Sequence, residues 1–236
     1  MSQCYSLSQP INNSSSNNLN PQAKLRLHCK YNISPQTPII LFLSRLRHNK
    51  CPDMLIKALS LINTNCLDFH LLIAGDGELD YIDYLKQLIN SLKLNNRVTF
   101  TGFVQNEQKN LLLQGADLFV LPSVSENFSI ATAEAMTAGK PVIVTPGVQL
   151  APEIIAANAG LMVERNIDAL LRGISKLLSS PKLREELGNN GFNWASNRYC
   201  PNQIAINLNH IYKAIINKSS YCESSISQVQ EYEMLK

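Results

Sequence analysis

The sequence has no apolar run long enough to cross a membrane. Its longest runs, such as "PIILFL" and "LFVLP", have the length of buried strands. The first residues, "MSQCYSLSQPINNSSSNNLN", lack the basic start and apolar core of a signal peptide. The 6 cysteines are scattered without a C-x-x-C pair, which favours reduced thiols over disulfides or zinc. We therefore expect a cytoplasmic protein with no transmembrane segment, while peripheral contact with a membrane surface stays open.

The chain also has little net charge and no dense cluster of Lys or Arg. Its 236 residues carry a formal net charge of +3, which argues against nucleic acid as a partner. Hydrophobic residues make up 45% of the sequence, enough for a sizeable core. Residues 1–20 are rich in Ser and Asn, and the tail, residues 217–236, is interpreted in the same way. Both segments are therefore predicted to be disordered. One domain, residues 21–216, remains.

Between these ends, short apolar runs alternate with amphipathic segments. Strands are expected at residues 39–43, 69–74, 97–100, 117–122, 141–144 and 160–163. Helices are expected at residues 52–63, 78–94, 107–114 and 130–138, and over most of 167–216. This alternation predicts an α/β fold, a single Rossmann-like doubly wound parallel sheet with helices on both faces. Strand runs that are apolar throughout fit a sheet buried on both sides.

Polar segments follow five of the predicted strands. In chain order they are "SRLRHNK", "GDG", "TGFV", "PSVSENF" and "TPGV". In parallel sheets of this kind, ligands bind beyond the carboxyl ends of the strands. The five segments are therefore predicted to converge on one pocket.

Charged residues in these segments suggest a ligand, although each has a simpler interpretation. Arg45 and Lys50 flank a turn and could hold a diphosphate, but alone they are more simply two solvated loop charges. Glu126 and Glu134 lie before and inside a predicted helix. They are either acceptors for the hydroxyls of one long polar ligand or a capping acid and a surface acid. His48 is interpreted as a loop histidine, because no second metal ligand stands at a suitable spacing.

Taken together, these segments resemble a known family. The stretches "FLSRLRHNKCPDMLIKAL", "LLIAGDGE", "VTFTGFV", "ADLFVLPSVSENFSIATAEAMTAGKPVIVT" and "APEI" resemble the C-terminal, donor-binding half of the group 1 (family 4-like) glycosyltransferases. These are retaining enzymes of the GT-B fold, in which two Rossmann-like domains face each other across a cleft. The most specific part is the pair of glutamates in "ENFSIATAE". The resemblance extends over residues 22–216 and implies one half of a GT-B fold.

The resemblance implies that the domain binds a nucleotide-diphosphate sugar as a substrate, with no cofactor and no metal. Its catalytic positions are Arg45 and Lys50, which match residues on the diphosphate, and Glu126, which matches a contact with the transferred sugar. Glu134 matches the glutamate that binds the nucleotide ribose. The other donor-binding positions are Gly102, Phe103 and Val104 at the base, Phe128, Ser129, Ile130 and Ala131 at the sugar and phosphate, and Ser44, Gly75, Gly77 and Asn127.

Three residues depart from the family pattern. Ser44, Cys51 and Ser129 stand where the family usually has glycine. Ser44 and Cys51 are expected to alter the shape of the first loop. Ser129 is expected to cap the following helix, although its Cβ would crowd the phosphate.

The family's acceptor-binding domain has no counterpart in the sequence. About forty residues precede the first predicted strand, so we expect that domain to be a separate partner or to have been lost. The face toward it should then carry exposed apolar surface. The alternatives are a non-catalytic nucleotide-sugar-binding module or an inert truncated remnant. An unrelated signalling receiver would need an acidic cluster where "SRLRHNK" is basic.

Overall fold

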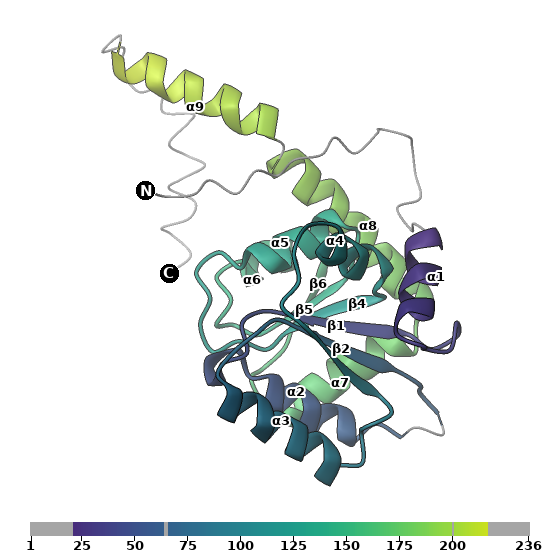
Figure 1. Cartoon of the computed structure of the whole chain (residues 1–236). Coiled ribbons are helices and arrows are strands. Elements are labelled where there is room, and N and C mark those ends of the chain that lie inside the picture. The colour runs from purple at the N-terminus through teal and green to yellow at the C-terminus, as the bar shows by residue number, and fades with distance from the viewer. Residues whose placement is uncertain (1–20, 64–65, 200, 217–236) are drawn as a thin grey trace. The chain divides into compact units, whose positions relative to one another are not determined.

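The strands of the sheet run parallel in the order β3-β2-β1-β4-β5-β6, as Figure 1 shows. The computed structural model describes residues 21–63, 66–199 and 201–216, so both segments predicted to be disordered lie outside the described residues. The strands are β1 (Ile39–Leu43), β2 (His70–Ala74), β3 (Val98–Gly102), β4 (Leu118–Leu121), β5 (Val142–Val144) and β6 (Gly160–Met162). The order reverses between β1 and β4, as in the Rossmann fold, and the predicted fold class is confirmed.

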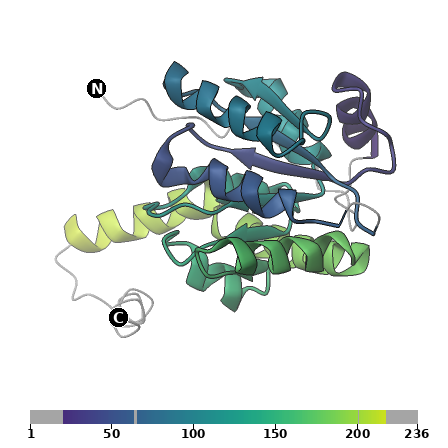
Figure 2. The same ribbon diagram turned by 90° about the horizontal axis from the view of Figure 1, so that it is seen from below.

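Helices cover both faces of the sheet. They are α1 (Pro21–Lys30), α2 (Pro52–Ser60), α3 (Leu79–Ser91), α4 (Asn106–Gly115), α5 (Ile130–Thr137), α6 (Ala151–Ala156), α7 (Ile167–Leu178) and α8 (Pro181–Arg198), with a 3-10 turn, η1, at His48–Lys50. Helices α1, α4 and α5 lie on one face, and α2, α3 and α7 lie on the other, which Figure 2 shows from below. Residues 196–199 and 201–216 belong to a separate unit that contains α9 (Pro201–Ile216). No helix within the described ranges is long and apolar enough to span a membrane.

The strands form where the sequence is apolar at successive positions. Every residue of β1, β4 and β5 is buried, as expected for a parallel sheet between two helical layers. Helix α7 adds Leu170, Ile174 and Leu177 to this core, all fully buried and spaced to share one side of the helix. Burial of each such side chain stabilises the fold by about 2 kcal/mol. Asn166 caps the start of α7, because its side chain accepts a hydrogen bond from the Ala169 N–H at 2.8 Å.

Two helices and one strand differ from the expectation. Helices α1 and α6 were not expected, because α1 is polar along most of its length and α6 is short. Helix α1 is nevertheless anchored by Leu27, which is fully buried. Arg97 lies before β3 rather than in it, because its N–H donates to the Leu94 carbonyl at 2.9 Å and closes a turn. The strand instead continues to Gly102, which was expected to be in a loop.

Candidate functional site

The loops after β1, β2 and β3 are joined along one edge of the sheet. Gly75 N–H donates to the Gly102 carbonyl at 2.9 Å. A Cβ atom at Gly75 would lie 1.9 Å from the Ser44 carbonyl oxygen, and one at Gly77 would lie 2.2 Å from that of Leu46. Both predicted donor-binding glycines therefore allow the first two loops to approach each other at the carboxyl edge of the sheet.

The loop after β4 is fixed to its neighbours on both sides. The Asn49 carbonyl accepts hydrogen bonds from Val124 N–H at 2.7 Å and from the Ser123 hydroxyl at 2.9 Å. Glu126 N–H donates to the carbonyl of Gly147, which follows β5, at 2.8 Å. These hydrogen bonds set the main chain beside Lys50 and Glu126. Asn49 was not predicted, because it acts through its main-chain carbonyl, which any residue could supply.

Lys50 and Glu126 form an ion pair at the point where the strand order reverses. Lys50 Nζ lies 2.6 Å from Glu126 Oε1, and the two side chains are only 11% and 18% exposed. Arg45 lies in the same loop as Lys50, is exposed, and forms no ion pair with another described residue. The structure thus brings the three predicted catalytic residues to two adjacent loops. The direct contact between Lys50 and Glu126 was not predicted.

Helix α5 begins beside this pair, with Ser129 in a left-handed conformation. Ser129 has φ +51° and makes no side-chain hydrogen bond that caps the helix. The predicted capping role is therefore wrong. The Ser129 hydroxyl instead shares a 2.6 Å hydrogen bond with the Thr132 hydroxyl. Of its neighbours, Asn127, Phe128 and Ile130 are exposed, and Ala131 is half-buried.

Glu134 lies inside α5, as the sequence predicts, but it is also paired. Its Oε1 atom lies 2.5 Å from Lys109 Nζ, on helix α4. The side chain of Glu134 is 18% exposed and that of Lys109 is 31% exposed. Lys109 was not predicted, because its partner stands on the next helix and no spacing within one element reveals the contact.

The loop predicted to meet the base has one exposed and one buried side chain. Gly102 is the last residue of β3, Phe103 is 69% exposed, and Val104 is 7% exposed. Phe103 therefore presents its ring at the surface of this edge. Val104 can face a ligand only through its main chain.

His48 and Cys51 help to shape the turn around Lys50. The His48 ring centroid lies 4.0 Å from that of Tyr81, so His48 packs as a loop residue. Cys51 stands at a position where the family usually has glycine, and its φ of +52° is a conformation that favours glycine. Its thiol donates to the His48 carbonyl at 3.3 Å. Burial raises the pKa of the Cys51 thiol. Cys29, Cys51 and Cys66 are free thiols, and the other cysteines lie outside the described residues.

The chain belongs to the group 1 glycosyl transferases, whose family model matches residues 24–194. Its sheet is that of one Rossmann-like half of a GT-B fold.

Several known proteins are similar to this chain in sequence or in structure. An uncharacterized glycosyltransferase of Methanocaldococcus jannaschii, MJ1607, is 34% identical over 200 residues, which is 83% of this chain and 50% of that protein. Anabaena HepE, solved in complex with UDP, has a TM-score of 0.70 and 25% identity, over 81% of this chain and 53% of HepE. The solved C-terminal domain of LpcC, a group 1 protein from Francisella tularensis, has a TM-score of 0.64 and 23% identity, over 78% of this chain and 94% of that domain. The chain spans about half the length of the curated relatives it matches.

Proposed function

We propose that this domain binds a nucleotide-diphosphate sugar and presents it for retaining, metal-independent glycosyl transfer. The acceptor would be held by the half of the relatives that this chain does not span. The observation that carries the proposal is the Lys50–Glu126 ion pair, 2.6 Å long, beside exposed Arg45 and the start of α5. These groups lie where doubly wound sheets bind phosphorylated ligands.

The charges suit the departure of a diphosphate. As the bond from the sugar to the diphosphate breaks, negative charge builds up on the leaving phosphate oxygens. Arg45, Lys50 and the N–H groups at the start of α5 would stabilise this charge. Preorganised donors of this kind contribute about 3–4 kcal/mol each. Glu126 would accept hydrogen bonds from the sugar hydroxyls, and Glu134 from the ribose.

The same edge carries large apolar side chains in contact with solvent. Leu79 is 77% exposed, Phe103 is 69%, Ile130 is 62% and Phe128 is 47%. Apolar side chains gathered on one edge are typical of a face that another protein surface covers. Positioning of an acceptor can supply about 7–11 kcal/mol of the barrier reduction. We therefore expect the chain on its own to show negligible transfer.

Calorimetric titration with UDP, GDP and ADP, with and without EDTA, tests donor binding. The chain should bind at least one of them equally well in both conditions. Arg45→Ala should weaken that diphosphate about tenfold or more, because it removes a charged phosphate contact, and should leave the free nucleoside unchanged. Arg172→Ala, an exposed arginine on α7, is the matched control and should change neither.

Three results would contradict the proposal: no binding, binding that vanishes on chelation, or equal losses for nucleotide and nucleoside. Donor binding without transfer, even when an acceptor-binding half is supplied, would instead identify a non-catalytic binding module.

A further inference from the structure

The ion pair between Lys109 and Glu134 joins two helices at the candidate site. Lys109 stands on α4, the helix that follows β3 and the loop predicted to meet the base. Glu134 stands on α5 and is predicted to meet the ribose. The Nζ–Oε1 distance is 2.5 Å, and the side chains are 31% and 18% exposed. By contrast, the Lys86–Asp83 pair within α3 is 59% and 63% exposed, so it is an ordinary surface pair.

The geometry leaves one carboxylate oxygen for a ligand. Lys109 contacts Oε1, and within the described part of the chain Oε2 has no hydrogen-bond donor. A carboxylate on a helix surface can rotate about its terminal torsion, which is broad. The Lys109 cation restricts this rotation and favours one orientation of the acceptor. A vicinal diol would then meet a carboxylate that needs little further ordering, which strengthens binding.

We propose that Lys109 is a positioning residue that orients Glu134 and thereby sets the preference of the site for ribonucleotides over 2′-deoxyribonucleotides. This rests on the proposed nucleotide-sugar binding. Lys109 acts through Glu134 and needs no contact with the nucleotide. A cation that only held α4 against α5 would affect both kinds of nucleotide alike, so the sugar preference separates the two roles.

The test compares UDP, GDP and ADP with their 2′-deoxy counterparts by calorimetric titration. The wild-type chain should bind its preferred ribonucleotide about tenfold or more tightly than the deoxy form, because an unpaired polar group in the site is costly. Lys109→Met should weaken the ribonucleotide about five- to tenfold and the deoxynucleotide less than about twofold, since only the oriented carboxylate is lost. Lys109→Arg, which keeps a cation at this position, should retain most of the preference for the ribonucleotide over the deoxynucleotide. Lys86→Met, the matched control, should leave both affinities unchanged.

A second measurement places the effect on Glu134. In a Glu134→Gln background, Lys109→Met should change ribonucleotide affinity by less than about twofold, because the two residues act as one unit. Equal weakening of both nucleotides, no preference in the wild-type chain, or additive losses in the double variant would overturn the role of Lys109 alone. If the wild-type chain binds none of the three ribonucleotides, the proposed function fails, and this inference fails with it.

Discussion

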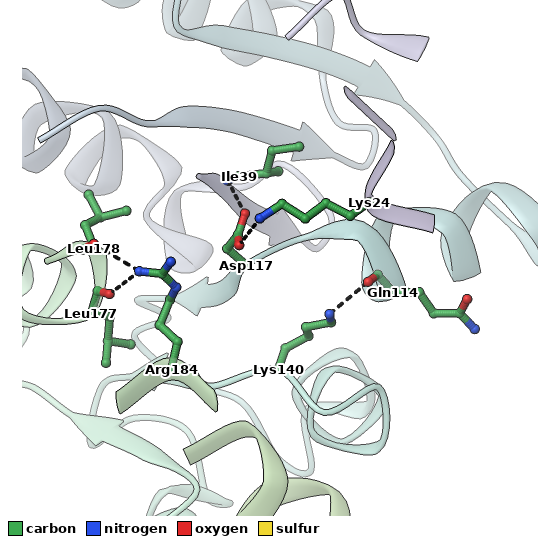
Figure 3. A network of polar contacts seen from close by, with 8 residues as sticks. All are labelled: Lys24, Ile39, Gln114, Asp117, Lys140, Leu177, Leu178 and Arg184. Carbon is green, nitrogen blue, oxygen red and sulfur yellow. Dashed lines mark hydrogen bonds and ion pairs between the residues drawn. The ribbon is translucent and has the colours of Figure 1, made fainter. Parts of the chain in front are cut away.

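The amino and carboxyl edges of the sheet both carry charged side chains, but the two edges differ in how these side chains are paired. At the amino edge, Asp117 accepts from the Ile39 N–H at 2.8 Å and pairs with Lys24 at 2.7 Å, as Figure 3 shows. Lys140, which is buried, donates to the Gln114 carbonyl at 2.8 Å. Each of these charged groups is thus hydrogen-bonded to, or paired with, another group of the protein.

At the carboxyl edge, charged groups are held in place but keep atoms accessible. Lys50 and Glu126 are paired, yet Arg45 in the same loop is exposed. Two residues there, Cys51 and Ser129, have positive φ although neither is glycine. Asn32, Lys93 and Asn158, in the segments that precede β1, β3 and β6, have positive φ as well, so this conformation does not distinguish the two edges. The charged groups of the amino edge thus serve the fold, and the exposed Arg45 at the carboxyl edge fits the proposal that this edge meets a ligand.

The largest effect should come from breaking the ion pair at the carboxyl edge. Lys50→Met leaves the Glu126 carboxylate, 18% exposed, without its cation. Loss of one partner of a fully buried pair costs about 3–5 kcal/mol, so for this partly exposed pair we expect about 2 kcal/mol of stability to be lost, measured by urea unfolding. Lys86→Met removes a surface pair as control and should cost less than about 0.5 kcal/mol.

The double variant sharpens this result. Lys50→Met combined with Glu126→Gln should be more stable than Lys50→Met alone by about 1 kcal/mol, because the uncompensated charge is gone. Equal stabilities for Lys50→Met and Lys86→Met would show that water, rather than the protein, satisfies Glu126.

At the amino edge, the effect should appear as a dependence on pH. Burial lowers the pKa of Lys140 to about 8. Between this value and the ordinary lysine pKa of about 10.4, the unfolded chain holds a proton that the folded chain has released, so stability rises with pH. From pH 7 to pH 9, Lys140 should contribute an increase of about 1 kcal/mol. Urea unfolding of Lys140→Met should lack this increase. Parallel stability–pH curves for the two proteins would show that Lys140 keeps its ordinary pKa when folded.

Much of the fold was predictable because it depends on local patterns. Fully apolar runs marked β1, β4 and β5, and Gly139, at φ +69°, ends α5 where the sequence predicted. The segments that converge on one edge were predicted too, since parallel strands place their carboxyl ends together. The sequence therefore predicted that the charged residues at the ends of these strands lie near one another, and the structure places Lys50 beside Glu126.

The remainder depended on packing between elements. Lys109 meets Glu134 only because α4 lies beside α5, and Lys50 meets Glu126 only because β1 pairs with β4. Asn49 contributes a carbonyl rather than a side chain. The left-handed conformation of Ser129 was not predicted either, because a serine that caps a helix ordinarily has an extended backbone conformation.

The smallest predicted effect concerns this serine. Ser129→Ala and Ser129→Gly both remove the 2.6 Å hydrogen bond to Thr132, worth about 1 kcal/mol. Only glycine also removes the Cβ atom, which at φ +51° costs about 1 kcal/mol. Ser129→Gly should therefore lie within about 0.5 kcal/mol of the wild-type chain, and Ser129→Ala about 1 kcal/mol below it, by urea unfolding.

The difference between these two variants isolates the backbone conformation, since both lose the same hydroxyl. Equal stabilities would mean that the start of α5 relaxes and stores no strain. Nucleotide titration of the same proteins then asks whether the Cβ atom crowds a phosphate. If it does, Ser129→Gly binds more tightly than Ser129→Ala, and the departure from the family's glycine weakens the donor site. If both bind alike, the Cβ atom points away from the phosphate and the serine affects only the local backbone.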